Sequence, residues 1–448
     1  IGVGKNQITM DQVSLDDISF YAAEDADVVI ELTEIFMKDL KKQKLFNYFK
    51  SIEIDLLPVL IDMQFNGIFI DKEYLENRSN EIGKKIESLE LEIINLAGEE
   101  FNLNSSQQLA VILFDKLKLP MIKKRSTAEA VLSELKDKHP LPELILSYRK
   151  LYKLKNTYLD PLPSYIVADT KRVHSSFNQT MTATGRLSTS SPNFQNIPIR
   201  TEDGKEIRKA IKAQSNEYQI FSADYSQVEL RVMAHLSGDE SLISALNNGE
   251  DIHTFTAKNI FNVDNDDMVL PEMRRIAKIV NFGIMYGAGP FRLSQELDIP
   301  FGEAKQIKDA YFQKYRGIEQ YIENSKLQIK ETKSVETLLG RKRAVWDSDS
   351  QNKIRRDAAE RMAINMPIQG TAAEMIKLAM IKIHRQMNKE NLKSKLIMQI
   401  HDELLLEVHQ DEIDYISKMV IEHMRNAMKL DVPIEIDFGI GPSWYEAH

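Results

Sequence analysis

The chain has 448 residues, which is long for a single hydrophobic core, so the sequence predicts two or three packed subdomains. It contains no cysteine, which excludes disulfides and cysteine-ligated zinc sites. The net charge of −9 argues weakly against a nucleic-acid partner, but basic residues gather in residues 171–212 and 341–361, so local basic patches are expected.

No segment of the sequence has the character of a membrane anchor or a signal peptide. The longest charge-free apolar run, near residues 279–291, is interrupted by Asn, Gly and Pro and is too short to span a bilayer. We therefore expect no membrane partner and a cytoplasmic location. Because the first residue is Ile, we expect a fragment of a longer product, and an organelle remains the alternative location.

The first part of the sequence predicts helices. Residues 21–36 form the amphipathic centre of a helical piece, and residues 71–96 predict a long charged helix. A further helix is expected to begin at Asn104 or Ser105, either of which can serve as its N-cap. Pro161 and Pro163 then end a helix and mark a subdomain border.

The stretch "SADYSQVELR", residues 222–231, predicts the exit of a short strand followed by a helix. Ser226 and Glu229 have the spacing of a capping box, in which each side chain satisfies a free amide at the start of the helix. Asp224 would then lie at the corner between strand and helix, where a carboxylate could hold a hard cation. The alternative is an ordinary turn residue, so the metal hypothesis needs a second acid.

The helix predicted for residues 271–286 has one chemically distinctive face. Arg274, Lys278, Phe282 and Tyr286 recur every four residues and therefore form one stripe. That order matches a nucleoside triphosphate, with its phosphates at the two cations and its base against an aromatic ring. Close approach of a base pair would explain Gly283 inside the helix. The alternative is a solvated cationic edge beside core aromatics.

The stretch "LIMQIHDELLLEV" predicts two strands of a hairpin with His401, Asp402 and Glu403 at or near the bend. Such a bend can bring Asp402 next to Asp224. Two Mg²⁺ ions bridged by this pair would activate a hydroxyl and stabilise the leaving oxygen of a phosphoryl transfer. An acidic hairpin tip also occurs simply for solubility, and Glu403 is the residue that this alternative fits best.

Several stretches together resemble the motifs of a known family. "DYSQVELR", "RRIAKIVNFGIMYG" and "IHDELLLE" resemble motifs A, B and C of family A DNA polymerases, the bacterial DNA polymerase I group. "TATGRLSTSSPNFQNIP", "DIHTFTA", "ERMAINMPIQGTAAEMIKLAM" and "GPSWYEAH" add matches, so the resemblance runs from about residue 66 to the end. It implies a DNA-directed DNA polymerase that extends a primer 3′ hydroxyl with dNTPs in DNA replication and repair.

The fold implied by the resemblance is α+β and predominantly helical: a right-hand polymerase with helical fingers and thumb and a palm built on an antiparallel sheet. The expected division is an exonuclease-like remnant at 1–50, the palm start at 51–74, the thumb at 75–150, palm at 151–225, fingers at 226–371 and palm at 372–448. The partners implied are primer–template DNA and dNTPs. Mg²⁺ is the implied cofactor, with Mn²⁺ as a substitute, and a monomer is expected.

The resemblance also implies the roles of individual residues. The metal ligands are Asp224, Asp402 and the Tyr225 carbonyl, and the catalytic set is Asp224, Asp402, Glu403 and Lys278. The nucleotide-binding set is Arg274, Lys278, His253, Phe282, Tyr286, Gln227 and Glu229, of which Glu229 matches a steric gate against a ribose 2′ hydroxyl. The DNA-binding set is Arg186, Gln195, Asn196, Arg361, Asn365, Gln369, His401, Lys123 and Lys124.

The chemistry of the minor groove suits the DNA-binding set. Its acceptors differ little among the four base pairs, so donors such as Arg186 and Gln369 can test the shape of a pair without reading sequence. Arg361, Asn365 and Gln369 repeat every four residues, and Pro367 is expected to bend or interrupt their helix. Surface salt bridges and caps are the alternative role for these polar side chains.

Two departures from the family pattern limit what the resemblance implies. The segment "KKRST" at 123–127 is shorter than the basic thumb segment that family members commonly carry. "YAAED", with Tyr21 and Asp25, resembles the last motif of a 3′–5′ exonuclease domain, but the earlier acidic motifs of that domain are absent from the sequence. We therefore expect no proofreading from this chain.

Three other functions would fit parts of the sequence. A single-subunit RNA polymerase would share the aspartates and the helix cations, but Glu229 and the spacing from Phe282 to Tyr286 disfavour it. Reverse transcription stays open, because no identified residue reads the sugar of the template. A catalytically inactive DNA-binding clamp would keep the basic patches, but it has no need of two acids beside a triphosphate site.

Overall fold

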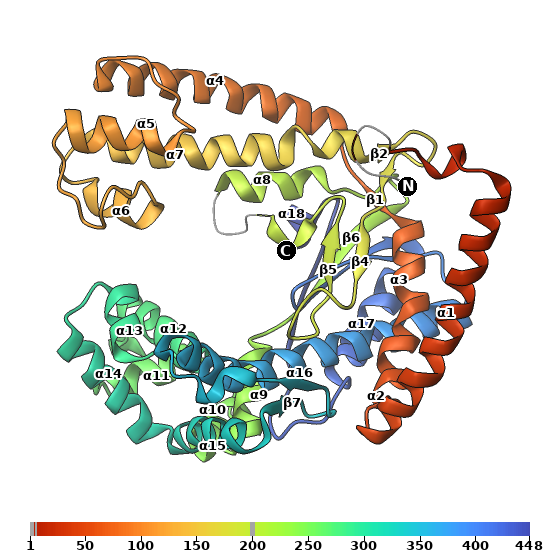
Figure 1. Ribbon diagram of the computed structural model, residues 1–448. Helices are drawn as coiled ribbons and strands as arrows, with labels where there is room; N and C mark the ends of the chain where they lie inside the picture. Colours follow the sequence, from red (N-terminus) through yellow and green to blue (C-terminus); the bar gives the residue numbers. More distant parts are fainter. Residues whose placement is uncertain (1–3, 5–6, 198–201) are drawn as a thin grey trace.

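The computed structural model describes residues 4, 7–197 and 202–448 (Figure 1). Two groups of helices lie on one side of the molecule, a sheet lies between them, and a long helix runs along the opposite edge. Helices predominate, and every strand pair in the described residues is antiparallel. This confirms the predicted α+β, predominantly helical fold class.

The central sheet has four strands in the order β11–β6–β10–β9. Their bounds are β6 Tyr218–Tyr225, β9 Lys395–Ile400, β10 Glu403–His409 and β11 Ile436–Gly441. β9 and β10 form the predicted hairpin, and His401 and Asp402 are its bend. Because successive side chains of a strand point to opposite faces, Leu404 and Leu406 enter one hydrophobic core and Leu405 enters a second.

The first core joins the sheet to the lower helical group of Figure 1. Its helices nearest the sheet are α3 Asp55–Asn66, α9 Val228–Ser237, α16 Lys353–Lys389 and α17 Ile413–Arg425. The remaining helices of this group are α10 Glu240–Asn247, α11 Ile252–Phe261, α12 Pro271–Met285, α13 Pro290–Leu297, α14 Phe301–Lys314 and α15 Arg316–Thr332. α12 occupies almost the whole range predicted for it.

The second core joins the other face of the sheet to the upper helical group of Figure 1. Its elements are α4 Lys72–Ala97, α5 Ser106–Ala110, the π-helical turn η4 Val111–Lys116, α6 Glu129–Leu135, α7 Pro140–Leu154, the π-helical turn η5 Lys155–Leu159, α8 Glu202–Ala210 and α18 Trp444–Ala447. Ser105 is the N-cap of α5 and accepts from Gln108 N at 3.4 Å, as one of the two predicted caps.

Short elements connect these groups. The strands are β1 Ile68–Phe69, β2 Ile166–Val167, β3 Arg172–Val173, β4 Ser176–Asn178, β5 Ser188–Ser190, β7 Ser334–Glu336 and β8 Lys342–Ala344. The helical turns are η2 Met10–Gln12, α2 Phe46–Tyr48, η3 Phe49–Ile54, η6 Leu162–Tyr165, η7 Phe194–Asn196, η8 Asp266–Met268, η9 Trp346–Asp349 and η10 Gln410–Glu412. Loop 179–186 links β4 to β5, and turn 337–341 links β7 to β8.

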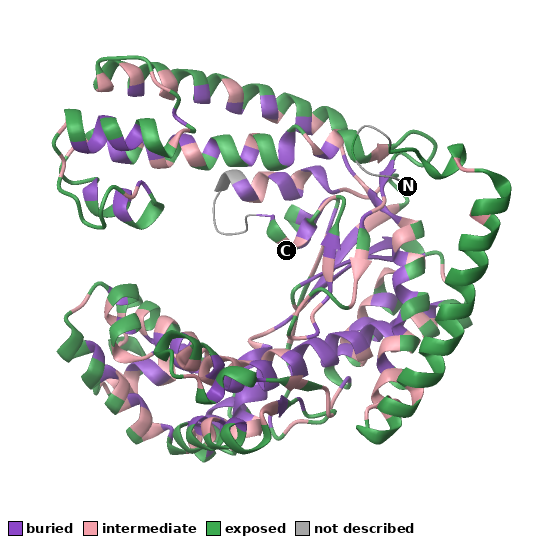
Figure 2. Cartoon of the chain, in the orientation of Figure 1, coloured by how far each residue is buried: buried purple, intermediate pink, exposed green. Residues whose placement is uncertain are grey.

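Two helices bear on predictions made from the sequence. The N-terminal helix α1, Leu15–Lys42, covers the helix predicted around residues 21–36, and none of its described residues is buried (Figure 2). α16 continues through Pro367, so the helix is not interrupted there, and a bend at this residue stays a prediction. None of the described helices combines the length and the apolar character that crossing a membrane requires.

Candidate active site

The register of the sheet brings Asp224 and Asp402 together; we call this pair the site acids. Glu403 lies opposite Asp224 across the ladder of β6 and β10. Asp402 directly precedes Glu403, and its carbonyl accepts a hydrogen bond from Tyr225 N at 3.2 Å. On the other side of β6, Asp437 of β11 also lies opposite Asp224. The pairing of strands therefore gathers acids that are far apart in the sequence.

Burial and mutual repulsion disfavour the charged forms of the site acids. Burial raises the pKa of Asp224 to about 7, and the charges of Glu403 and Asp402 add to the increase. Burial also raises the pKa of Asp402, while nearby Arg186 acts in the opposite direction. An external cation would relieve both effects, because it stabilises the ionised carboxylates.

The donor set of the site fits Mg²⁺ in a particular way. The described residues contain no cluster of three or more His, Cys, Asp or Glu side chains arranged to hold a metal. Mg²⁺ commonly binds through one or two carboxylates and completes its shell with water and substrate phosphates. Two carboxylates at a partly open position meet that requirement, and the side chain of Tyr225 is buried with its hydroxyl donating to Met424 O at 2.8 Å.

Glu403 is held by the C-terminal segment of the chain. Its Oε1 accepts from Ser222 Oγ at 2.5 Å and from Trp444 Nε1 at 2.8 Å, and His448 Nδ1 lies 3.2 Å away. Glu403 is buried as the first residue of β10, with a neighbouring imidazole whose pKa it raises. These contacts fix the position of the Glu403 carboxylate beside the site acids.

A cavity of about 410 Å³ opens beside Asp402. Arg186 Nη2 donates to Glu229 Oε1 at 2.6 Å and lies 3.6 Å from Asp402 Oδ1, and the Tyr286 hydroxyl donates to Glu229 Oε2. Most of the predicted nucleotide-binding residues meet here. The lining is Arg186, Tyr225, Gln227, Val228, Glu229, Phe282, Tyr286, His401 and Asp402.

The predicted capping box at Ser226 and Glu229 is wrong. The residue before α9 is Gln227, which has φ of +50° and makes no side-chain cap, and the Glu229 carboxylate is bonded to Arg186 and Tyr286 instead. Burial raises the pKa of Glu229 against the opposing effect of Arg186. Partners from distant parts of the chain outcompete the local amide, since they satisfy a buried carboxylate more completely.

The stripe predicted on α12 is present. Arg274 and Lys278 are exposed, and Phe282 and Tyr286 are half-buried with their ring centroids 6.3 Å apart. Arg274 is already paired, because its Nη2 lies 2.7 Å from Asp251 Oδ2. This pair was missed from the sequence, although Asp251 carries a local signal as the N-cap of α11.

Two residues near α12 have surroundings that differ from the sequence expectation. A Cβ at Gly283 would lie 3.0 Å from Leu293 Cδ2, so close packing against α13 is a second reason for a glycine here, beside the predicted approach of a base pair. His253 is buried against Phe282 with a centroid distance of 5.7 Å, and its Nδ1 lies 3.1 Å from Asn281 Nδ2. Burial lowers the pKa of His253 to about 4, so the imidazole is neutral at pH 7.

The DNA-binding set surrounds the cavity unevenly. Arg361, Asn365 and Gln369 are half-buried on one face of α16. Among the described residues, buried side-chain atoms without a hydrogen-bond partner include three from this set, namely Arg186 Nε, Gln195 Nε2 and Asn365 Oδ1. Buried polar atoms without partners are rare in folded proteins, and a bound ligand is one reason for keeping them.

The other members of the set lie at the periphery. Asn196 and His401 are exposed, and His401 has φ of +51° in the bend of the hairpin. Lys123 and Lys124 are exposed in the connection between η4 and α6. In Figure 1 this connection lies at the end of the upper helical group that is remote from the sheet.

Comparisons with known proteins show which family the sequence matches. The model of DNA polymerase family A matches residues 72–446. DNA polymerase I of Pseudomonas aeruginosa is 43% identical over 100% of this chain and 50% of its own length, and the thermostable DNA polymerase I of Thermus filiformis is 48% identical over 90% of this chain and 49% of its own length. The chain thus spans about half the length of these relatives.

A solved structure has a similar fold. The polymerase domain of Pol1 from M. smegmatis, in a complex with DNA primer-template and dNTP, has a TM-score of 0.90 and is 39% identical. The match covers 94% of this chain and 74% of that chain.

Proposed function

The chain belongs to DNA polymerase family A, and we propose that it is a DNA-directed DNA polymerase that extends a primer 3′ hydroxyl with dNTPs in replication or repair. The observation that carries this proposal is the cavity beside Asp402, which Glu229, Phe282 and Tyr286 also line. Acids with raised pKa values beside the rings of Phe282 and Tyr286, on a helix that also carries Arg274 and Lys278, suit a nucleotide with its metal ions.

Each part of the site has a task in this proposal. Arg274 and Lys278 bind the triphosphate, Phe282 lies against the incoming base, and Arg186 and Gln369 contact the minor groove near the primer end. Asp224, Asp402 and the Tyr225 carbonyl would hold two Mg²⁺ ions, or Mn²⁺ in their place, which activate the primer hydroxyl and stabilise the leaving oxygen. Because His253 is buried and neutral, it supports the ring of Phe282 more directly than it binds a phosphate.

The remaining assignments extend the proposal. The thumb comprises residues 75–150 and the fingers residues 226–371, and the protein acts as a cytoplasmic monomer on primer–template DNA. Tyr21 and Asp25 lie on the exposed helix α1, and because the sequence lacks the earlier acidic motifs of an exonuclease domain, the proposal includes no proofreading by this chain. Excision of a mismatched primer end that is lost in Asp25→Ala would contradict this point.

Primer extension with the purified chain tests the proposed activity. DNA and RNA templates are each combined with dNTPs and NTPs. We expect efficient extension with DNA template, dNTPs and Mg²⁺. Extension with NTPs alone would favour an RNA polymerase, and binding of DNA without any extension would favour an inactive clamp.

The proposed role of Glu229 as a steric gate against a ribose 2′ hydroxyl has a separate test. Glu229 lies at the cavity wall, bonded to Tyr286, where a 2′ hydroxyl would displace this contact. We expect Glu229→Ala to lower the preference for dCTP over CTP by about 100-fold, measured as the ratio of kcat/KM values. Unchanged discrimination in a folded Glu229→Ala protein would show that the gate lies elsewhere.

A further inference from the structure

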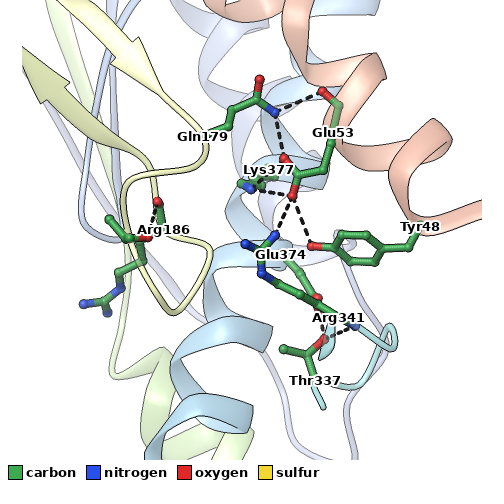
Figure 3. Close-up of polar contacts among 9 residues, drawn as sticks. Tyr48, Glu53, Gln179, Arg186, Thr337, Arg341, Glu374 and Lys377 are labelled. Atoms are coloured by element: carbon green, nitrogen blue, oxygen red, sulfur yellow. Dashed lines mark hydrogen bonds and ion pairs between the residues drawn. The ribbon is translucent and has the colours of Figure 1, made fainter. Parts of the chain in front are cut away.

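A second cluster of charged side chains lies where η3, α16 and turn 337–341 meet (Figure 3). It consists of Glu53, Arg341, Glu374 and Lys377, which we call the Glu53 network. Oε1 of Glu53 accepts from Arg341 Nη1 at 2.9 Å and from Lys377 Nζ at 2.9 Å, and Lys377 Nζ lies 3.1 Å from Oε2. No step of the proposed reaction uses these side chains directly.

The Glu53 carboxylate is fixed by the number and the burial of its partners. The Lys377 side chain is 1% exposed, so its charge requires an internal carboxylate. Burial lowers the pKa of Lys377, and the charge of Glu53 opposes that shift. The Tyr48 hydroxyl adds a further contact to Oε1 at 3.4 Å. A carboxylate has about four acceptor positions, so little rotational freedom remains for Glu53.

The Glu53 network contacts loop 179–186 near both of its ends. At the start of the loop, Gln179 Nε2 donates to Glu53 Oε2 at 2.7 Å and to Glu53 O at 3.0 Å. Near its end, Gly185 has φ of +84°, and a Cβ there would lie 2.8 Å from Arg341 Nε. The backbone of residue 185 therefore rests directly on the guanidinium that Glu53 orients.

Arg186 immediately follows this contact. Its carbonyl accepts from Thr182 Oγ1 at 2.6 Å, which closes the loop, and a Cβ at Gly370 of α16 would lie 3.2 Å from Thr184 O. The side chain of Arg186 points away from the Glu53 network (Figure 3) and reaches Glu229 at 2.6 Å. The position of the guanidinium therefore depends on how the loop behind it is held.

We propose that Glu53 is a positioning residue for the polymerase reaction, which acts by holding loop 179–186 and thereby places Arg186 beside the site acids. The proposal rests on the proposed function, because it assigns Arg186 a contact with the end of the primer. Glu53 is not among the residues that line the cavity beside Asp402. Its effect on the reaction must therefore pass through Arg186, and this requirement is testable.

A double-mutant cycle between Glu53→Gln and Arg186→Ala provides the test. In single-nucleotide primer extension, we expect Glu53→Gln to lower kcat about tenfold while KM for the dNTP changes less than about twofold, because Arg274 and Lys278 are untouched. In the Arg186→Ala background, the same change should lower kcat less than about twofold. Equal fold losses of kcat in both backgrounds would overturn the proposal, because a general loss of structure lowers kcat by the same factor whether or not Arg186 is present.

A second variant covers the case in which Glu53→Gln does not fold. Gln179→Leu removes the amide link to Glu53 and leaves every charge in place, and we expect a loss of kcat of about threefold that vanishes with Arg186→Ala. A neutral Gln179→Leu would overturn the proposal. The matched control is Asp55→Asn, which breaks the ion pair with Arg385 at 2.7 Å just beyond Glu53 and should leave extension unchanged.

A crystal structure of Glu53→Gln separates this proposal from the proposed function. We expect the 2.6 Å contact between Arg186 and Glu229 to be lost, whether or not the protein extends primers. An unchanged contact would overturn the positioning role. If the wild-type chain extends no primer, the proposed function fails while the structural readout for Arg186 still stands.

Discussion

The Glu53 network and the site acids differ in how their charge is balanced. In the Glu53 network two acids face two cations, and the Lys377 ammonium lies within 2.9 Å of its carboxylate. At the sheet, the cation that contacts the site acids is Arg186, 3.6 Å from Asp402, and Arg186 is shared with Glu229. One cluster is neutralised from within the protein, and the other keeps an excess of negative charge.

This difference in charge balance distinguishes acids that stabilise the fold from acids that are suited to binding a cation. Acids that the protein itself neutralises hold elements together, because removing one partner leaves a buried charge. Acids that have raised pKa values and few cationic partners within the protein destabilise the fold when they are ionised. A bound cation offsets this destabilisation. Neutralising Glu53, which pairs with Arg341 and Lys377, is therefore expected to destabilise the fold, whereas neutralising a site acid is not.

The largest expected effect comes from neutralising a site acid. Asp402→Asn should lower primer extension by about 10⁴-fold, or roughly 5 kcal/mol of barrier, if it holds the metal ions. Its melting temperature should equal or exceed that of the wild type, because repulsion with Asp224 is removed. Extension assays and thermal unfolding measure the two effects.

The control for this substitution is Asp437→Asn, which changes an exposed acid in register with Asp224. It should keep extension within about threefold of the wild type. A site-acid variant that retains activity, or that unfolds at a much lower temperature, would remove the distinction between the two clusters.

The next effect in size is expected from the Glu53 network. Lys377→Met should lower the free energy of unfolding by about 3–5 kcal/mol, because Glu53 loses its buried partner. Urea unfolding followed by circular dichroism measures this loss. Lys393→Met, which removes an exposed lysine 3.7 Å from Asp411, should change the free energy by less than about 0.5 kcal/mol. Similar results for both variants would argue against an internally balanced network.

The smallest of the three effects depends on pH. Burial raises the pKa of Glu374 from 4.5 to about 7, so the folded protein holds this proton more tightly than the unfolded chain. The resulting stabilisation is complete below pH 4.5 and is lost as the pH rises to about 7. Glu374→Gln mimics the protonated form and keeps the acceptor for Thr337.

We therefore expect Glu374→Gln to be more stable than the wild type at pH 8, by at most about 3 kcal/mol, and nearly equal to it at pH 4.5. Thermal unfolding of both proteins across this range measures the difference. A difference that is independent of pH would mean that Glu374 is ionised throughout and fully balanced by the cations of its network.

The sequence predicted the features that depend on residues close together in the chain, such as helix ends, caps and hairpins. The bounds of α12 follow from Pro271 at its start and the glycines after Tyr286, and the cap of α5 follows from Ser105. The hairpin follows from apolar residues on both sides of His401 and Asp402. The resemblance to family A polymerases added the roles of the site residues, which still await the experiments above.

The sequence did not predict side-chain contacts between residues that are far apart in the chain. Glu229 has the spacing of a capping residue, but its carboxylate pairs with Arg186 and Tyr286. The Glu53 network was not predicted at all, because its members come from three separate elements that lie far apart in the sequence.

The length of α16 has a consequence for how this fold can change. One helix carries Gln369 of the predicted DNA-binding set and Lys377 of the Glu53 network. Each added residue would rotate everything beyond it by about 100° and advance it by about 1.5 Å. A single insertion between Gln369 and Lys377 would thus turn the Lys377 ammonium away from the Glu53 carboxylate. The number of residues between these two positions therefore cannot change without breaking the ion pair.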